Sequence, residues 1–474
     1  MNDRLNAAVA RTAEPGEVEQ SLYEVRKKIY PRAVSGVFAG WRWGLVWLTQ
    51  VIFYGLPWMT WNNRQAVLFD LGARKFYIFG LVFWPQDFIY LTALLIIAAY
   101  SLFLFTAIGG RLWCGYACPQ TVYTEMFLWV ERKVEGDRAA RMRLDESAMG
   151  GRKFALKALK HAIWIAIALW TGFTFVGYFT PIRELLHQVA AFDLGGLQAF
   201  WILFYGFATY GNAGWMREQV CKYMCPYARF QSAMFDKDTM IVTYDPARGE
   251  PRGARSRKAD TKALGLGDCV DCTMCVQVCP TGIDIRNGLQ YECIGCAACI
   301  DACDQVMAKM GYPKGLVRYA TENAITNRWD TSHMLRRIVR PRTMIYTAIL
   351  GLIVAVAGIS LYNRVPLKAD LVPDRAAIGR EVEGELENVY RLQVMNTREH
   401  AHRYRISVSG LPGLRIDGED EVDMAPASTR QVPIRLRVPL SQAPEKGSHK
   451  IEVHLEAVDD PSLRVNEKTV FLVR

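Results

Sequence analysis

Residues 269–303 read CVDCTMCVQVCPTGIDIRNGLQYECIGCAACIDAC, and this stretch decides what kind of fold the chain can form. It contains two runs in which three cysteines are each separated by two residues and a fourth follows after three more. The first run is Cys269, Cys272, Cys275 and Cys279, and the second is Cys293, Cys296, Cys299 and Cys303. This spacing is typical of a bacterial ferredoxin segment that holds two [4Fe–4S] clusters.

The spacing also predicts which cysteines share a cluster, because the fourth cysteine of each run reaches the other cluster and is expected to open a short helix. The expected ligand sets are Cys269, Cys272, Cys275 and Cys303 for one cluster, and Cys293, Cys296, Cys299 and Cys279 for the other. Zinc is the alternative, but a zinc site needs only two cysteine pairs. Asp304 stands where proline usually follows the fourth cysteine, and since proline does not bind iron, the ligands are unaffected.

Five apolar stretches are long enough to cross a bilayer. They cover residues 43–61, 88–108, 161–180, 197–216 and 344–362. The connecting segments differ in charge, since residues 217–342 contain 19 Lys and Arg whereas residues 62–87 contain three. The positive-inside rule therefore predicts a cytoplasmic N-terminus and a cytoplasmic cysteine-rich segment, and an odd number of spans places the C-terminal part across the membrane.

The remaining four cysteines form two pairs that share the pattern Cys-x3-Cys-Pro. These cysteines are Cys114, Cys118, Cys221 and Cys225. Each pair follows an apolar stretch, which indicates an internal duplication that brings the pairs together. Positions i and i+4 share one face of a helix, so we expect each pair to present two thiols to one ligand.

Several interpretations of these two pairs remain open. They could be buried structural cysteines, while a disulfide is disfavoured in a reducing compartment. Two matched pairs favour a metal, and soft thiolates suit Cu(I), zinc or a further iron–sulfur cluster. Met216 and Met224 are near the second pair in sequence and could add thioether donors.

The C-terminal part has no cysteine and is expected to be a separate all-β domain. Short runs such as YRISV (404–408) and VPIRLRV (432–438) alternate apolar and polar residues between turn formers. Runs of this kind across about 110 residues are typical of an immunoglobulin-like sandwich. Because it lacks a cluster of metal-ligating residues, we expect a binding or docking module.

Composition and motifs exclude several classes of function. The net charge of +10 is concentrated in the first 362 residues, because residues 363–474 contain 17 Lys and Arg against 18 Asp and Glu. Basic residues beside apolar spans mark cytoplasmic loops, and no nucleic-acid recognition motif accompanies them. Among seven histidines, only His161 falls in an expected span, which excludes bis-histidine haem ligation there. Nucleotide fingerprints are absent, so electrons must come from another protein or from quinol.

Three further stretches carry a resemblance to a known family. WCGYACPQTVYTEMF (113–127), CKYMCPYARFQ (221–231) and QAVLFDLGARKFYIFGLVFWPQDF (65–88), together with the double cysteine run, resemble the FixG/RdxA/CcoG family. Its members are assembly factors for cbb3-type cytochrome c oxidase. The resemblance implies a cupric reductase of the bacterial inner membrane that supplies Cu(I) to the haem–copper centre. It also implies a copper site at Cys114, Cys118, Cys221 and Cys225, a periplasmic C-terminal domain, and oxidase assembly machinery or copper chaperones as partners.

The sequence thus predicts a multi-domain membrane protein with a five-helix transmembrane domain. The expected parts are a cytoplasmic segment (1–42), a four-helix transmembrane region (43–216), a ferredoxin-like α+β domain (217–342), a fifth transmembrane helix (343–362) and an immunoglobulin-like β-sandwich (363–474). Two functions remain: copper reduction in oxidase assembly, and transfer of quinol electrons to a respiratory or maturation partner. For quinol binding, Asp87 and Arg64 at the outer ends of spans are candidates. A homodimer is compatible with the sequence, which does not identify the electron donor.

Overall fold

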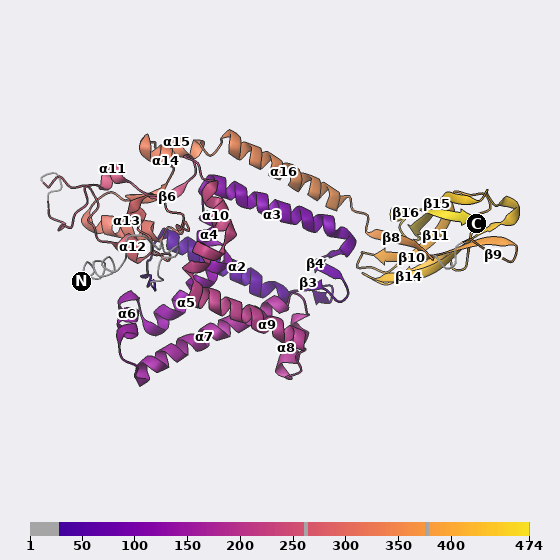
Figure 1. Cartoon of the computed structure of the whole chain (residues 1–474), viewed down its shortest axis with the longest axis horizontal. Coiled ribbons are helices and arrows are strands. Elements are labelled where there is room, and N and C mark those ends of the chain that lie inside the picture. Colours follow the sequence, from indigo (N-terminus) through magenta and orange to yellow (C-terminus); the bar gives the residue numbers. More distant parts are fainter. Residues whose placement is uncertain (1–27, 260–263, 375–378, 474) are drawn as a thin grey trace, which may run out of the picture.

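The computed structural model describes residues 28–259, 264–374 and 379–473, so most of the expected N-terminal segment (1–42) lies outside the described residues. Three parts follow one another along the long axis (Figure 1). The cysteine-rich domain is at one end, helices form the middle, and a β-sandwich is at the other end. The prediction of separate cysteine-rich and all-β parts on either side of the apolar helices agrees with this arrangement.

Helices are present at all five places where spans were expected. They are α2 (Val37–Gly55), α3 (Phe88–Gly109), α7 (Gly151–Val176), α9 (Gly196–Thr209) and α16 (Pro341–Tyr362). Within the described ranges, three helical stretches are long and apolar enough to cross a membrane: Pro85–Gly109, Gly151–Val176 and Pro341–Tyr362. The prediction of five spans is therefore confirmed only in part. The helix α2 carries the polar residues Arg42 and Gln50, and α9 has only 14 residues before it continues as a π-helix.

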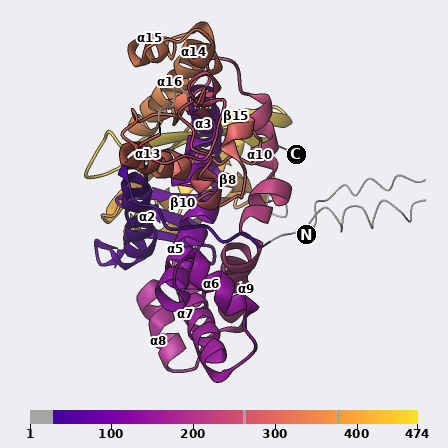
Figure 2. The same cartoon turned by 90° about the vertical axis from the view of Figure 1, so that its left-hand side faces the viewer.

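The apolar helices form two groups on opposite sides of the molecule. The helices α3 and α16 pack against each other, as do α7 and α9, and the two views show these pairs on either side of α2 (Figures 1 and 2). The apolar windows of α3 and α16 contain no buried residue. A continuous apolar surface of this kind fits lipid better than water, which supports membrane association.

Shorter helices and strands connect these spans. The helices are α4 (Leu112–Tyr116), α5 (Pro119–Glu135), α6 (Arg138–Glu146), α8 (Ile182–Ala190) and α10 (Pro226–Ala233). A three-stranded sheet of β3 (Val67–Asp70), β4 (Lys75–Ile78) and β5 (Leu81–Phe83) joins α2 to α3 at the end that faces the sandwich (Figure 1). A two-residue pairing of β1 (Thr60–Trp61) with β2 (Arg64–Gln65) precedes it.

The cysteine-rich domain is built around one antiparallel strand pair and two short helices. The strand β6 (Ile241–Tyr244) pairs with β7 (Val317–Ala320), and the helices are α12 (Met274–Gln277) and α13 (Ala298–Met310). Residues at the same place in the two runs, Thr273 and Ala297, both have left-handed backbone before their helix. The two runs therefore share a local conformation. The fourth cysteines do not open helices as expected, since Cys279 follows α12 and Cys303 lies inside α13. Three short helices complete the domain: α11 (Pro246–Gly249), α14 (Glu322–Thr326) and α15 (Thr331–Arg336).

The C-terminal part is the predicted antiparallel sandwich. One sheet has the order β12-β14-β10-β8 with β9 on β10, and the other has the order β13-β11-β15-β16. The inward positions of one expected run are all buried, namely Val432, Ile434, Leu436 and Val438. The strands are β8 (Leu367–Pro373), β9 (Arg380–Val382), β10 (Glu385–Asn396), β11 (His402–Ser409), β12 (Arg415–Asp417), β13 (Glu421–Met424), β14 (Thr429–Pro439), β15 (Gly447–Ala457) and β16 (Arg464–Val473).

The sandwich is attached to the helical part through charged residues. The buried carboxylate of Asp87 accepts hydrogen bonds from Arg364, at 2.6 Å, and from Lys368. Arg64 forms an ion pair with Glu399 of the sandwich. Asp87 and Arg64, the candidates for a quinol pocket, therefore hold the C-terminal domain in place. The quinol interpretation of these two residues stays a prediction, and their observed contacts are interdomain.

Candidate functional site

Two enclosed cavities in the cysteine-rich domain are lined by the predicted ligand sets. One is bordered by Cys269, Cys272, Cys275 and Cys303, and the other by Cys279, Cys293, Cys296 and Cys299, with Cys275 also at its wall. The structure thus brings together the cysteines that the crossed pattern assigns to each cluster. Within the described part, no three His, Cys, Asp or Glu side chains converge closely enough to hold a single ion. Four thiols spread around a cavity suit a cluster, in which each thiolate binds a different iron atom, better than zinc.

Buried cations beside the second cavity provide a second test of whether a cluster fits. Arg42 donates a hydrogen bond to the carbonyl of Cys296, and Arg111 donates to the carbonyl of Tyr291. Both guanidinium groups are buried, and among the described residues neither forms an ion pair with a carboxylate. One nitrogen of Arg111, Nη2, has no partner at all there. Arg42 interacts with Glu125 and Asp301 at longer range, and because buried cations without an ion pair are unfavourable, a cluster held by four thiolates would be a further favourable anion here.

Burial favours the protonated thiol at several of the cluster cysteines. Burial raises the pKa of Cys293 and Cys303 to about 12 and that of Cys275 to about 11. Loading a cluster therefore has to displace protons from these thiols, which makes metal binding dependent on pH.

The two Cys-x3-Cys-Pro pairs have a geometry that differs from the expected one. Cys114 lies in the short helix α4, but Cys118 has extended backbone and caps the N-terminus of α5. In the same way, Cys221 lies in the π-helix Val220–Met224, and Cys225 caps α10 with extended backbone. The residue before a proline avoids helical backbone, so the helix that contains the first cysteine of each pair ends before the second cysteine. The prediction that each pair shares one helix face is therefore wrong.

The pairs nevertheless lie together, as the internal duplication predicted. Cys114 interacts electrostatically with Cys221, and Cys118 interacts with Cys225. Burial raises the pKa of Cys114 to about 12 and that of Cys221 to about 11. Burial also raises the pKa of Cys118, although backbone N–H groups at the start of α5 oppose this effect. The result is a group of four neighbouring, half-buried thiols, although no three of them converge closely enough in the described residues to hold a single ion as they stand.

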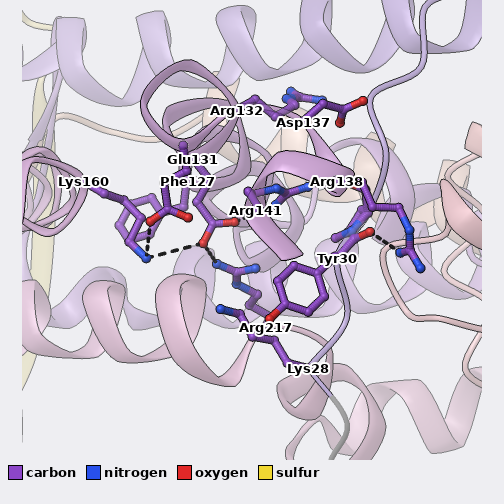
Figure 3. A network of polar contacts seen from close by, with 12 residues as sticks. Lys28, Tyr30, Phe127, Glu131, Arg132, Asp137, Arg138, Arg141, Lys160 and Arg217 are labelled. Atoms are coloured by element: carbon purple, nitrogen blue, oxygen red, sulfur yellow. Dashed lines mark hydrogen bonds and ion pairs between the residues drawn. The ribbon is translucent and has the colours of Figure 1, made fainter. Parts of the chain in front are cut away.

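Polar contacts from α5 hold the second pair against the first. The side-chain amide of Gln120 donates to the carbonyls of Asn212, at 2.9 Å, and Arg217, at 3.1 Å. Farther along α5, the buried carboxylate of Glu131 binds Arg217 at 2.6 Å and Arg141 at 2.8 Å (Figure 3). These cations lower the pKa of Glu131 although its burial would raise it. Arg217 is four residues before Cys221, so this network fixes the segment that carries the second pair.

The segment that joins Cys114 to Cys118 also lies directly against one cluster loop. An added Cβ on Gly115 would be 2.8 Å from the backbone of Cys296 and from the carbonyl of Ile294. On the opposing loop, Gly295 has left-handed backbone, and a Cβ added to it would be 3.2 Å from the backbone of Arg111. The segment between Cys114 and Cys118 therefore touches the loop of the second cluster at van der Waals distance. A side chain at either glycine would prevent this approach.

A cavity of about 60 Å³ lies between the second pair and the same cluster loop. Cys221 and Cys296 both line it, together with the buried side chains of Arg42 and Glu218. Cys114 is held on the other side, where its thiol donates to Gln231 at 3.2 Å. Met224, one of the two possible thioether donors, is 56% exposed, so the structure gives it no evident role beside these thiols.

Comparison with known proteins finds family models that match three separate parts of the chain. Family models match a "4Fe-4S dicluster domain" at residues 216–322, a "4Fe-4S binding domain" at residues 90–135, and an "IG-like fold at C-terminal of FixG" at residues 357–474. The chain is 39% identical over 444 residues to the nitrogen fixation protein FixG of Rhizobium meliloti, covering 86% of this chain and 85% of that protein. The chain belongs to the FixG/RdxA family.

Another relative, RdxA, supports the same assignment, and one solved structure is also similar to part of the chain. Protein RdxA of Cereibacter sphaeroides is 38% identical over 444 residues, covering 91% of this chain and 93% of RdxA. A crystal structure of a FixG-related protein from Vibrio parahaemolyticus is similar with a TM-score of 0.22 and 22% identity, covering 23% of this chain and 97% of that one. As a member of the FixG/RdxA family with recognised 4Fe-4S domains, the chain is an iron–sulfur electron-transfer protein.

Several residues that shape this FixG/RdxA site were not identified from the sequence. Arg42, Arg111, Gln231 and Glu218 all border the thiols or the cluster loop. Only Gly115 offered a signal, because a glycine between two cysteines indicates close backbone approach. The charged residues gave none, since their partners are distant in sequence.

Proposed function

We propose that this protein reduces Cu(II) to Cu(I) during assembly of a cbb3-type cytochrome c oxidase. Copper is the substrate, and the copper site is formed by Cys114, Cys118, Cys221 and Cys225. The observation that supports the proposal is the contact of Gly115 with the loop of Cys296, because the segment between two of the thiols then lies against the loop of one cluster.

The residues of the site suit this reaction. Thiolates stabilise Cu(I) over Cu(II), so binding at the four thiols favours the reduced ion. The two clusters, when bound, supply single electrons, which is the number that reduction of Cu(II) requires. Copper binding must displace the protons of Cys114 and Cys221, whose pKa values are raised by burial. Gln231 holds the thiol of Cys114 beside Arg111, whose Nε donates to the same amide oxygen at 3.2 Å.

We also propose the membrane orientation. The protein lies in the bacterial inner membrane with five helices across it, the cysteine-rich domain in the cytoplasm and the sandwich in the periplasm. The placement of these domains at opposite ends of the apolar helices supports this orientation (Figure 1). So does the concentration of 19 Lys and Arg in residues 217–342. The sandwich then serves as a docking module for oxidase assembly machinery or a copper chaperone.

A second candidate function has one specific observation in its favour. The family model for a 4Fe-4S binding domain covers residues 90–135, which include Cys114 and Cys118. In this alternative the four thiols hold a further cluster. The protein would then pass quinol electrons to a respiratory or maturation partner.

Anaerobic single-turnover oxidation distinguishes the two functions. The purified full-length protein is reduced with dithionite, freed of excess reductant and mixed with Cu(II), while cluster absorbance and Cu(I) are followed together. A Cys114→Ala/Cys118→Ala variant tests the thiols, and Met224→Leu is the control because its side chain is exposed. Iron and sulfide are quantified in each protein.

Copper reduction predicts that clusters reoxidise with stoichiometric Cu(I), that the double variant loses this reaction with its iron content unchanged, and that the control keeps it. Equal copper reduction by wild type and double variant would exclude these thiols as the copper site. Iron and sulfide matching three clusters, with a loss of one cluster in the double variant, would support the second function instead.

A further inference from the structure

A large apolar cavity lies between α2, α5 and α7, apart from the clusters and the four thiols. Its volume is about 660 Å³, which is within the range of small-molecule sites. Three tryptophans line it, and the rings of two of them, Trp43 and Trp129, meet edge to face at 6.5 Å. At its mouth Trp47 is 66% exposed, so the cavity opens on the outside of the helices.

The wall of this cavity contains one polar atom without a partner. Gln50 lines the cavity and is 8% exposed; its side chain interacts with the hydroxyl of Tyr123, but its amide oxygen accepts no hydrogen bond within the described part of the chain. One turn farther along α2, Tyr54 also lines the cavity, and its hydroxyl is 2.9 Å from that of Thr171. A buried amide oxygen without a donor is unfavourable, so the site calls for a ligand that donates a hydrogen bond.

We propose that this cavity binds the headgroup of a hydroquinone. The hydroxyl of a hydroquinone can donate to Gln50, and its ring matches a lining of tryptophan side chains. A lipid acyl chain would fill the space but leave Gln50 without a donor, and an oxidised quinone offers only acceptors. A single water could donate but would leave most of an apolar cavity of this size empty. The exposed mouth lets an isoprenoid tail remain in the lipid.

The position of the cavity also suits an electron donor. Met126 lines it, and Cys118 caps the N-terminus of the same helix, α5. Eight residues of helix separate the two, or about 12 Å along the axis. Complete oxidation of a hydroquinone releases two protons to water and two electrons, and two one-electron clusters would accept one electron each. The inference rests on the proposed function only in naming the reductant of those clusters.

Binding is measured with a redox-inert probe, heptyl-hydroxyquinoline N-oxide, whose hydroxyl can donate as a hydroquinone does. Quenching of its fluorescence is titrated on oxidised, copper-free, full-length protein in lipid nanodiscs. Gln50→Leu removes the acceptor and keeps the apolar wall. Val51→Trp places a large ring at the mouth of the cavity, and Leu48→Trp is the matched control on a part of α2 that does not line it.

We expect saturable binding of one probe per chain. The Gln50→Leu variant should bind the probe about 2- to 10-fold more weakly than the wild type, because one hydrogen bond is lost. Val51→Trp should abolish binding, and Leu48→Trp should leave it unchanged. Unchanged binding in Val51→Trp, or absence of saturable binding with a tightly held lipid found by mass spectrometry, would overturn the inference.

Failure of this inference is distinguishable from failure of the proposed function. Copper reduction starts from dithionite-reduced protein and does not use the cavity, so Val51→Trp should reduce copper like the wild type. Loss of copper reduction in the cysteine variant, conversely, should leave probe binding intact.

Discussion

Replacement of Gly115 by alanine tests the contact that joins the four thiols to the cluster loop. The new methyl group would be 2.8 Å from the backbone atoms of Cys296 and from the carbonyl of Ile294, whereas ordinary contact begins at 3.4 Å. The surfaces must therefore separate by about 0.6 Å, the difference between these two distances. All three opposing atoms belong to the backbone, so no side chain can rotate away.

The size of the effect follows from this clash. Overpacking of a rigid contact costs about 1–3 kcal/mol, which corresponds to a shift of about 5- to 150-fold in the equilibrium between docked and separated surfaces. The clusters themselves should be unaffected, because Gly115 is not a ligand. We expect Gly115→Ala to keep its iron and sulfide while electron transfer from the clusters to Cu(II) slows at least about fivefold.

Two measurements check this prediction. Stopped-flow absorbance follows cluster reoxidation by Cu(II), and hydrogen–deuterium exchange follows protection of residues 290–297. Gly109→Ala is the matched control, since its Cβ would lie at an ordinary 3.5 Å from Leu112. If Gly115→Ala matches the control in both rate and protection, the contact does not hold the two surfaces together and the reasoning fails.

Two further predictions concern other parts of the chain. Asp87→Asn removes the buried carboxylate that Arg364 binds, which should cost about 3–5 kcal/mol. Limited proteolysis after residue 363 should become faster than in the control Glu452→Gln, whose ion pair with Lys468 lies within the sandwich, and equal rates would refute an interdomain role. Burial, reinforced by Asp370, raises the pKa of Glu467, so the folded state should lose stability as pH rises above about 4. Calorimetry of the full chain should show that Glu467→Gln stabilises the sandwich at pH 7 but not at pH 4. The gain at pH 7 should be less than about 1 kcal/mol, because the group is partly exposed. A gain in stability at both pH values would contradict the assignment.

Local sequence patterns predicted the parts of the structure that depend on neighbouring residues. The ligand sets of the two cavities followed from spacing alone, because three cysteines two residues apart must surround one point of a tight loop. The sandwich followed from period-two runs such as 432–438, since alternate side chains of a strand face opposite sides. Both patterns are complete within a few residues of chain.

Features that depend on distant residues or competing local preferences were missed. Cys114 and Cys118 were expected on one helix face because of their spacing, but the proline after the second cysteine breaks that helix. Asp87 looked like an isolated charge at a span end, and its partner Arg364 is 277 residues away. The contact between Gly115 and the cluster loop likewise could not be predicted from nearby residues, apart from the presence of a glycine at this position.

The cysteine-rich domain and the helices are joined through the same buried charges that favour cluster binding. Asp301 of α13 accepts hydrogen bonds from the backbone of Phe38 and Ala39 and so caps α2, which has no side-chain cap of its own. From the same helix Arg42 reaches the carbonyl of Cys296, and both cations near this loop lack a carboxylate partner in the described ranges. Asp301 and Arg42 therefore hold the domain on α2 without help from Gly115, and an anionic cluster in the second cavity would add a favourable interaction with both cations. Loss of the Gly115 contact should then separate the four-thiol site from the cluster loop while the clusters stay in place.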